Sequence, residues 1–180
     1  MEISGRSFPL ALGESMVYKS GNKLKKLGVP WITKAGYLDL TKLPIDVILA
    51  QAVGDDGEKF RSACRILGLM ASAGRIEAEI ILYGLLSYFA GDTARKQSVI
   101  EALGNVPTRK SAESLFMELE KTTSSNSTRS YIDSVLRAFR SFPLDLVEGG
   151  FRRMLSDRRW SYRMKRKFME FLDDAEFRNI

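Results

Sequence analysis

Arginine recurs at a constant interval along the chain, and this interval limits the folds that the sequence can adopt. Arg61, Arg95, Arg129 and Arg163 are equally spaced, and each lies near the start of a stretch with helical apolar spacing. Such an interval, when helix pairs carry it, is typical of repeat proteins in which neighbouring units bury each other's apolar faces. The sequence therefore predicts an all-α protein built from repeated helix pairs.

Eight helical stretches in four pairs are expected after the first quarter of the chain. Their ranges are 45–53 with 56–72, 76–90 with 92–104, 110–122 with 127–141, and 143–156 with 159–173. Within them, apolar residues recur every three or four positions, as in the series Trp160, Met164, Phe168 and Leu172, and Gly, Pro and polar linkers fall between them. We therefore expect an α-α superhelix of about four helix pairs over 44–180.

Residues 1–43 differ from the rest, because turn signals separate short apolar pieces there. We expect an irregular, basic N-terminal arm or cap that contains a small hairpin or short helices. Aromatic residues lie among its lysines, which are Lys19, Lys23, Lys25, Lys26, Lys34 and Lys42. Two interpretations follow: a nucleic-acid surface, or a cap in which Trp31 and its apolar neighbours cover the first helix pair.

The net charge of +6 is concentrated in one segment. Residues 152–167 contain eight basic residues and one acid, a net charge of +7, so the remaining residues together carry −1. A concentrated basic patch favours an anionic partner, which could be an acidic protein surface, nucleic acid or anionic lipid. A polar end cap of a repeat array is the alternative. The expected binding residues are Arg152, Arg153, Arg158, Arg159, Lys165, Arg166 and Lys167.

Aromatic residues in the same segment have two interpretations. Trp160 and Tyr162 could stack on nucleic-acid bases. The apolar stripe that begins at Trp160 instead favours packing of this side chain in the core.

Enzyme chemistry finds little support in the composition. The chain has no His, which removes His-based catalytic sets and imidazole metal sites, and its one cysteine, Cys64, lies in an apolar helical stretch that favours burial. No phosphate-binding loop or dinucleotide fingerprint is present. We therefore expect no catalytic residue, metal site or cofactor. The apolar runs are too short to span a bilayer, and the first residues do not read as a signal peptide, so we expect a cytoplasmic protein.

Two of the second helices, with the turns before them, resemble HEAT repeats of the short form named after phycobilisome lyases. The matching residues are Asp55, Asp56, Phe60, Arg61, Leu67, Gly68, Asp92, Arg95, Ala102, Leu103 and Gly104. The third and fourth units keep only the arginine, the helical pattern and Asp157. The resemblance implies a right-handed α-solenoid that is mostly used for binding.

The resemblance also implies a structural role for the repeated arginine. In HEAT-like arrays, an Asp in the turn and an Arg in the second helix bond across neighbouring repeats. The ladder of Arg61, Arg95, Arg129 and Arg163 is therefore expected to join the units, and a basic concave stripe is the functional alternative.

Three functions remain open from the sequence. The first is a non-catalytic binding module, a scaffold or adaptor for a protein partner with an acidic surface. The second is a nucleic-acid-binding protein that uses the basic patch of residues 152–167. The third is an enzyme of the lyase or alkylpurine DNA glycosylase type, since HEAT-like groups with these activities exist, although no such site can be placed on these residues.

Overall fold

The computed structural model describes residues 30–33 and 37–178. The chain divides between Leu43 and Pro44 into two units, and each is described by itself. In the first unit, the described residues form one isolated antiparallel bridge, between Ile32 and Leu38, and a short 3-10 helix, η1 (Leu40–Lys42). Asp39 starts this helix by accepting a hydrogen bond from the backbone N–H of Thr41 at 3.1 Å.

Most of the expected N-terminal basic surface lies outside the described residues. This applies to Lys19, Lys23, Lys25, Lys26 and Lys34. Lys42 is described and forms an ion pair of 2.9 Å with Asp39. Both interpretations of this segment therefore stay predictions.

The second unit contains eight α-helices, and the described residues of the whole chain contain no strand. The helices are α2 (Ile45–Val53), α3 (Gly57–Ser72), α4 (Ile76–Tyr88), α5 (Thr93–Leu103), α6 (Arg109–Lys121), α7 (Arg129–Ala138), α8 (Leu144–Ser156) and α9 (Tyr162–Arg178), with a 3-10 turn, η2 (Phe139–Ser141), after α7. The predicted all-α class is confirmed. The eight expected stretches correspond to the eight helices.

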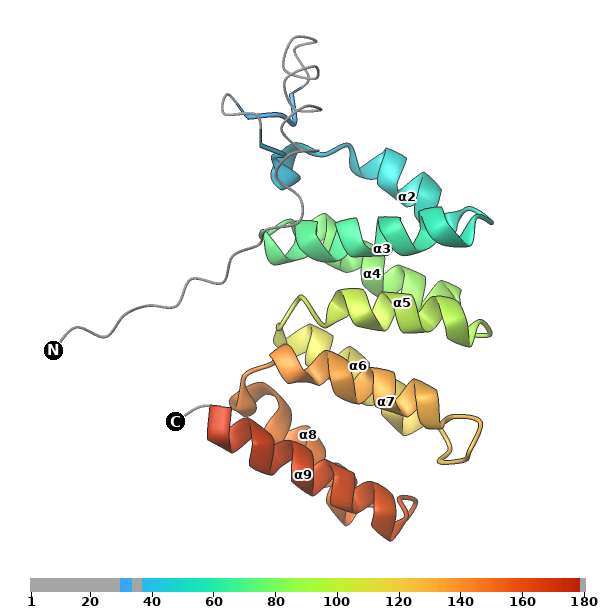
Figure 1. The fold of residues 1–180 in the computed structure, drawn as a ribbon, viewed down its shortest axis with the longest axis vertical. Helices are drawn as coiled ribbons and strands as arrows, with labels where there is room; N and C mark the ends of the chain where they lie inside the picture. The colour runs from blue at the N-terminus through green and yellow to red at the C-terminus, as the bar shows by residue number, and fades with distance from the viewer. Residues whose placement is uncertain (1–29, 34–36, 179–180) are drawn as a thin grey trace, which may run out of the picture. The chain divides into compact units, whose positions relative to one another are not determined.

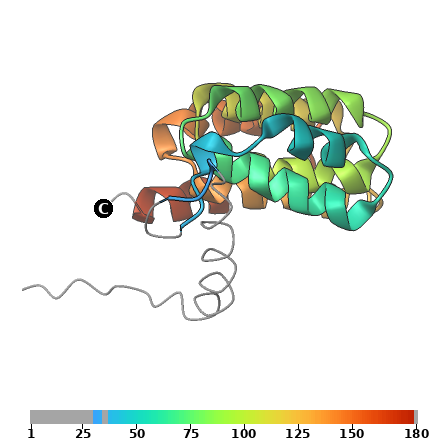
Figure 2. The same ribbon diagram turned by 90° about the horizontal axis from the view of Figure 1, so that it is seen from above.

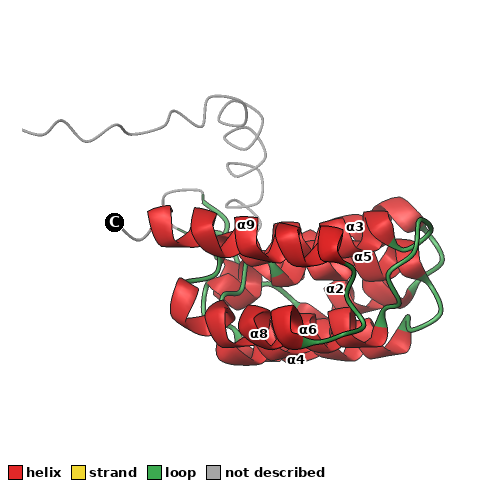
Figure 3. Ribbon diagram, turned by 90° about the horizontal axis from the view of Figure 1, so that it is seen from below, coloured by secondary structure: helices red, strands yellow, loops and turns green. Residues whose placement is uncertain are grey.

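The helices of the second unit are arranged in two layers. Figure 1 shows α3, α5, α7 and α9 following one another down the stack, and Figure 3 shows α4, α6 and α8 on the other side. At the start of the stack, α2 packs against α3 and α4. Figure 2, seen from that end, shows both rows of helices. Each helix pair thus meets its sequence neighbours.

The second helices of the first three pairs begin at equal spacing, 36 positions apart. Their N-cap residues are Asp56, Asp92 and Thr128. The Asp56 carboxylate accepts from the backbone N–H groups of Glu58 and Lys59 at 2.9 and 3.1 Å, and the Asp92 carboxylate accepts from the N–H of Arg95 at 3.0 Å. These bonds satisfy donors that the helix itself leaves free. The turn aspartates therefore fix where the helices start.

Two glycines lie where successive second helices approach closely, α3 to α5 and α5 to α7. A Cβ atom on Gly68 would lie 2.8 Å from the carbonyl oxygen of Ala102, and one on Gly104 would lie 3.1 Å from the Cα of Ala138. A larger residue at position 68 would require the backbone of α5 to move, and one at position 104 would press against the backbone of Ala138. In both contacts the two residues are 34 positions apart in the sequence, the same interval as between the repeated arginines. This interval therefore relates residues that face each other on neighbouring helices. Equivalent helix starts are 36 positions apart.

The core lies between the layers. In its C-terminal half, phenylalanine rings pack against one another with centroids 4.5 Å apart for Phe116 and Phe139 and 4.6 Å apart for Phe151 and Phe171. The stripe predicted for the last helix is buried, because Trp160, Met164, Phe168 and Leu172 are each less than one tenth exposed. Each large side chain buried in this way contributes about 1.5–3 kcal/mol. Within residues 30–33 and 37–178, no helix is long and apolar enough to cross a membrane.

Candidate functional site: a groove between α7 and α9

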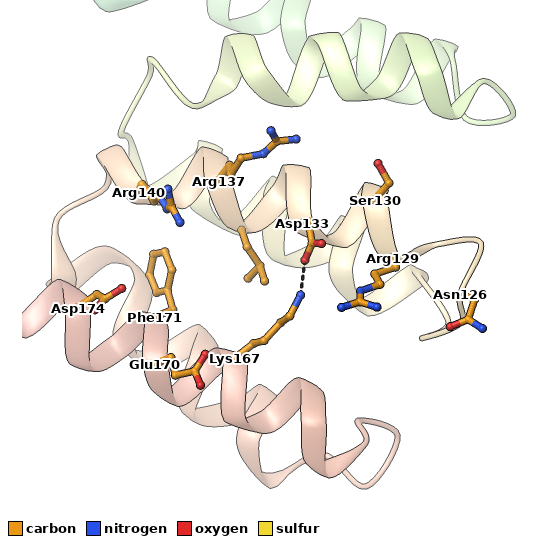
Figure 4. A pocket seen from close by; sticks show the side chains of 11 residues that line it. Asn126, Arg129, Ser130, Asp133, Arg137, Arg140, Lys167, Glu170, Phe171 and Asp174 are labelled. Atoms are coloured by element: carbon orange, nitrogen blue, oxygen red, sulfur yellow. Dashed lines mark hydrogen bonds and ion pairs between the residues drawn. The ribbon is translucent and has the colours of Figure 1, made fainter.

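A hollow of about 1120 Å³ lies between α7 and α9, with side chains of both helices pointing into it (Figure 4). In the same layer α3 packs closely on α5, and α5 on α7, but α7 and α9 make few close backbone contacts. Sequence explains the difference. Gly68 in α3 and Gly104 after α5 are 36 positions apart, and the residue 36 positions after Gly104 is Arg140, not a glycine. The side chain of Arg140 lines the hollow. Without the glycine, the two helices part and leave a groove.

Charged residues of both signs line this groove. The cations are Arg129, Arg137, Arg140 and Lys167. The carboxylates are Asp133, Glu170 and Asp174. A run of phosphates would meet repulsion from the carboxylates, whereas a protein surface can match both signs.

One ion pair crosses the groove. The ammonium of Lys167, on α9, lies 2.6 Å from a carboxylate oxygen of Asp133, on α7 (Figure 4). The side chains are about a quarter and two fifths exposed, so water reaches the pair. Surface pairs of this kind are worth about 0–1 kcal/mol, so this one sets the spacing of two side chains more than it stabilises the fold.

Arg129 adds a second cation at the same place. It is the first residue of α7, and its side chain extends into the space between the helices (Figure 4). Its guanidinium has no hydrogen bond or ion pair with another described residue. Asp133 is paired with Lys167 alone, so the charge of Arg129 is not matched by this carboxylate.

An apolar floor adjoins these charges. Leu136 of α7 and Phe171 of α9 line the same groove, and the ring of Phe171 is held from behind by Phe151. Glu170, one residue before Phe171, is engaged with Arg166 at 3.3 Å. The groove thus offers an apolar contact beside a positive end.

A smaller hollow of about 450 Å³ lies where α5 and α7 end. Its polar lining includes Asn105, Ser134 and Ser141. Arg137 and Arg140 line both hollows, so the end of α7 presents arginines on two sides.

Four of the seven residues predicted to form the basic binding patch are ion-paired within the chain. The pairs are Arg152 with Glu148 at 2.6 Å, Arg159 with Asp157 at 2.6 Å, Arg166 with Glu170 at 3.3 Å, and Lys167 with Asp133 at 2.6 Å. Arg159 also donates to the backbone carbonyl of Glu120 at 3.0 Å and so joins the turn before α9 to α6. These pairs reduce the positive charge that the segment presents.

The other three patch residues are Arg153, Arg158 and Lys165. Arg153 and Arg158 are exposed, Lys165 is partly buried, and none has an ion pair with another described residue. They come from α8, the following turn and α9 respectively. Tyr162, the aromatic candidate beside them, is 80% exposed, whereas Trp160 is buried in the core. Only Lys167 of the predicted set lines the groove.

The arginine ladder differs from the prediction at three of its four positions. Arg95 does join neighbouring pairs: it donates to the backbone carbonyl of Asp55 at 3.3 Å and lies over the rings of Phe60 and Phe89. Arg61, Arg129 and Arg163 are exposed. Asp157, the aspartate in the turn before α9, binds Arg159 and not an arginine of the ladder.

Helix geometry explains this correction. Arg61, Arg95 and Arg129 follow their N-cap residues by five, three and one positions. The arginine therefore lies two positions closer to the helix start on each successive helix. Since each residue of an α-helix turns by about 100°, its direction changes by about 200° from one helix to the next. One interaction cannot recur along such a series.

Buried polar side chains, which the sequence did not reveal, join the pairs instead. The Glu118 carboxylate of α6 accepts a hydrogen bond of 2.6 Å from Tyr131 of α7 and forms an ion pair with Lys96 of α5. Between α4 and α6, the hydroxyl of Tyr83 lies 2.9 Å from that of Ser111 and also bonds to Glu79. Glu118, Tyr131 and Ser111 are buried, whereas Tyr83 and Glu79 are partly exposed.

Chemically reactive groups are scarce in the described part of the chain. Cys64 is buried, and burial raises the pKa of its thiol to about 12. No group of three or more His, Cys, Asp or Glu side chains among these residues could hold a metal ion. The groove between α7 and α9 brings together cations, carboxylates and two apolar side chains.

Comparison of the chain with protein-family models, with curated proteins and with solved structures gave no match.

Proposed function

We propose that this protein is a non-catalytic binding module, a HEAT-like α-solenoid that holds a protein partner in the groove between α7 and α9. The observation that carries the proposal is the groove itself, where two helices of one layer part and present charges of both signs beside an apolar floor. The stacked pairs support the solenoid part, because each pair meets its sequence neighbours and the glycine contact recurs between α3 and α5 and between α5 and α7.

A covalent block of the groove tests the proposal. Glu170 is exposed and its side chain lies on the groove side of α9 (Figure 4), so a Glu170→Cys variant coupled to a bulky maleimide would fill the groove. The natural Cys64 does not interfere, because it is buried and its pKa is about 12. Ser87→Cys, at an exposed position on α4 in the other layer, is the matched control.

The readout is binding of peptides that the wild-type chain selects from a random display library. We expect the blocked Glu170→Cys protein to lose the selected peptides, and the blocked Ser87→Cys protein and the unlabelled Glu170→Cys protein to keep them. Selected peptides that bind equally well to the groove-blocked protein would place the binding site elsewhere and contradict the proposal.

Nucleic-acid binding is a second candidate, favoured by Arg153 and Arg158 near the turn between α8 and α9, which are exposed and have no ion pair with another described residue. Affinity for phosphates falls steeply with salt because bound counterions are released. Binding of duplex DNA or single-stranded RNA that weakens steeply with salt, and that is lost when Arg153, Arg158 and Lys165 are changed to Glu, would support this candidate over the first.

A further inference from the structure

We infer that the groove between α7 and α9 recognises an acidic side chain, Asp or Glu, of a partner segment that also carries an apolar residue. This inference rests on the proposed function, since it names the chemistry that the proposed binding site selects. Arg129 and Lys167 receive the carboxylate, and Leu136 and Phe171 receive the apolar side chain.

Local charge is the first argument. Arg129 and Lys167 enter the groove from opposite helices, and Asp133 is the carboxylate that meets Lys167, at 2.6 Å (Figure 4). Glu170 is engaged with Arg166. The guanidinium of Arg129 has no hydrogen bond or ion pair with any described residue. Since Asp133 balances Lys167, this end of the groove carries one positive charge in excess. A guanidinium binds a carboxylate through two parallel hydrogen bonds, which gives both strength and direction.

The form of the anion is the second argument. Asp133 remains in the groove beside the two cations, and Glu170 and Asp174 lie further along it. A nucleic-acid strand would bring a phosphate for every nucleotide into this row of carboxylates. A single carboxylate on a protein segment meets the excess charge without that repulsion.

The apolar floor is the third argument. Leu136 lies on α7 close to Asp133, and Phe171 lies one helical turn after Lys167 on α9. A segment whose acidic residue reaches Arg129 therefore passes this floor as it follows the groove. An apolar side chain bound there would be buried away from water, and this burial adds affinity that does not depend on the salt concentration.

Three variants test the inference against peptides that the wild-type chain selects from the display library. We expect the selected peptides to be enriched in Asp or Glu near an apolar residue. Arg129→Glu should weaken their binding about tenfold or more, since it replaces a charge-assisted bond with repulsion. Arg163→Glu is the matched control, because Arg163 is also exposed and near the start of α9 but does not line the groove. Asp133→Asn should strengthen binding, because it frees Lys167 for the ligand. A purely structural role for Asp133 would predict no gain.

The outcomes separate the inference from the proposed function. If the maleimide block abolishes binding but the peptides are not acidic, or Arg129→Glu binds them unchanged, the carboxylate inference is wrong and the groove remains the binding site. If no peptide is selected, but single-stranded RNA binds and Arg129→Glu loses it, both the inference and the protein-binding function are wrong. Arg129 and Arg163 are exposed, so both charge reversals should fold, and thermal melting of each variant checks this.

Discussion

The phenol of Tyr131, on α7, donates a hydrogen bond of 2.6 Å to the carboxylate of Glu118, on α6, and both side chains are buried. Lys96, on α5, forms an ion pair with the same carboxylate. One buried carboxylate therefore joins three helices. Burial by itself would raise the pKa of Glu118, but the hydrogen bonds from Lys96 and Tyr131 outweigh it and hold this pKa below its ordinary value of 4.5.

Acid should therefore weaken the fold through Glu118. A carboxyl whose pKa is lower in the folded than in the unfolded chain stabilises the fold above its ordinary pKa, and this stabilisation is lost as the pH falls through the lower folded value. We expect the free energy of unfolding to begin falling near pH 4.5 and to continue falling below it. Urea titrations at several pH values would show a smaller slope in Glu118→Gln than in the wild type. The exposed Glu113 on the same helix provides the control, and an equal slope in Glu113→Gln and Glu118→Gln would contradict the assignment.

Two adjacent glycines of α8 should respond in opposite ways to alanine. A Cβ on Gly150 would overlap the ring of Phe116, which is itself packed against Phe139 and Phe151, whereas a Cβ on Gly149 would meet nothing within 4 Å. We expect Gly150→Ala to destabilise the protein by about 1–3 kcal/mol through overpacking. Gly149→Ala should stabilise it by about 0.5–1 kcal/mol, because alanine favours the helix. Chemical denaturation measures both, and equal effects would show that α8 does not approach α6 so closely.

Arginines of the ladder should differ in their contribution to stability. Arg95→Ala removes the bond to the Asp55 carbonyl and the contacts with the rings of Phe60 and Phe89, so we expect a loss of about 1–2 kcal/mol. Arg61 is exposed, and Arg61→Ala should change the free energy of unfolding by less than about 0.5 kcal/mol. Similar losses of stability in the two variants would show that Arg61 and Arg95 stabilise the stack equally, as the sequence predicted.

The cations of residues 152–167 should differ in how much they contribute to thermal stability. Arg159 binds Asp157 and the carbonyl of Glu120, so Arg159→Glu should lower the melting temperature. Changing Arg153, Arg158 and Lys165 together to Glu removes no ion pair among the described residues, so melting should be nearly unchanged. Thermal melting of the two proteins side by side is the measurement. A triple variant that melts much lower than Arg159→Glu would show that these three cations, and not Arg159, support the fold.

The thiol of Cys64 should report opening of the core. It is buried in α3, and burial raises its pKa to about 12, so little thiolate exists at neutral pH. We expect a disulfide reagent to react very slowly with the native protein and quickly after denaturation. The exposed thiol of Ser87→Cys should react at once in the native state. Fast labelling of native Cys64 would mean that α3 is not packed as described.

The helices could be predicted from sequence because local signals and tertiary packing agree. Asp56 and Asp92 stand where the sequence pattern places helix starts, and they cap α3 and α5. The stripe from Trp160 to Leu172 is buried, as its spacing requires. Where caps and apolar spacing point to the same boundary, few other local structures compete with the helix.

The register between the helices could not be obtained in the same way. The recurring arginine suggests that its own interval is the repeat length, but that interval relates residues in contact, such as Gly68 and Ala102. Equivalent helix starts are two positions further apart. The two intervals differ because residues in contact, such as Gly68 and Ala102, lie on the facing sides of two helices and are not equivalent positions of the repeat.

The groove was missed for a related reason. Its position depends on a glycine that is absent at Arg140, and an absence is visible only once the true register is known. One signal is present in the sequence: Asp133 and Lys167 have opposite charge and stand at the same interval as Gly68 and Ala102, as expected for a pair on facing helices. Charge complementarity at that interval would have placed α7 and α9 opposite each other.

The glycine contact between second helices has a consequence for how such a chain can lengthen. Gly104 faces Ala138 across α5 and α7, and Ala102 stands one helix-start spacing before Ala138. A second copy of residues 92–127, inserted directly after the first, would set Gly104 of the first copy against Ala102 of the second, and Gly104 of the second copy against Ala138. Gene duplication of this one segment would therefore add a helix pair without creating a new kind of joint.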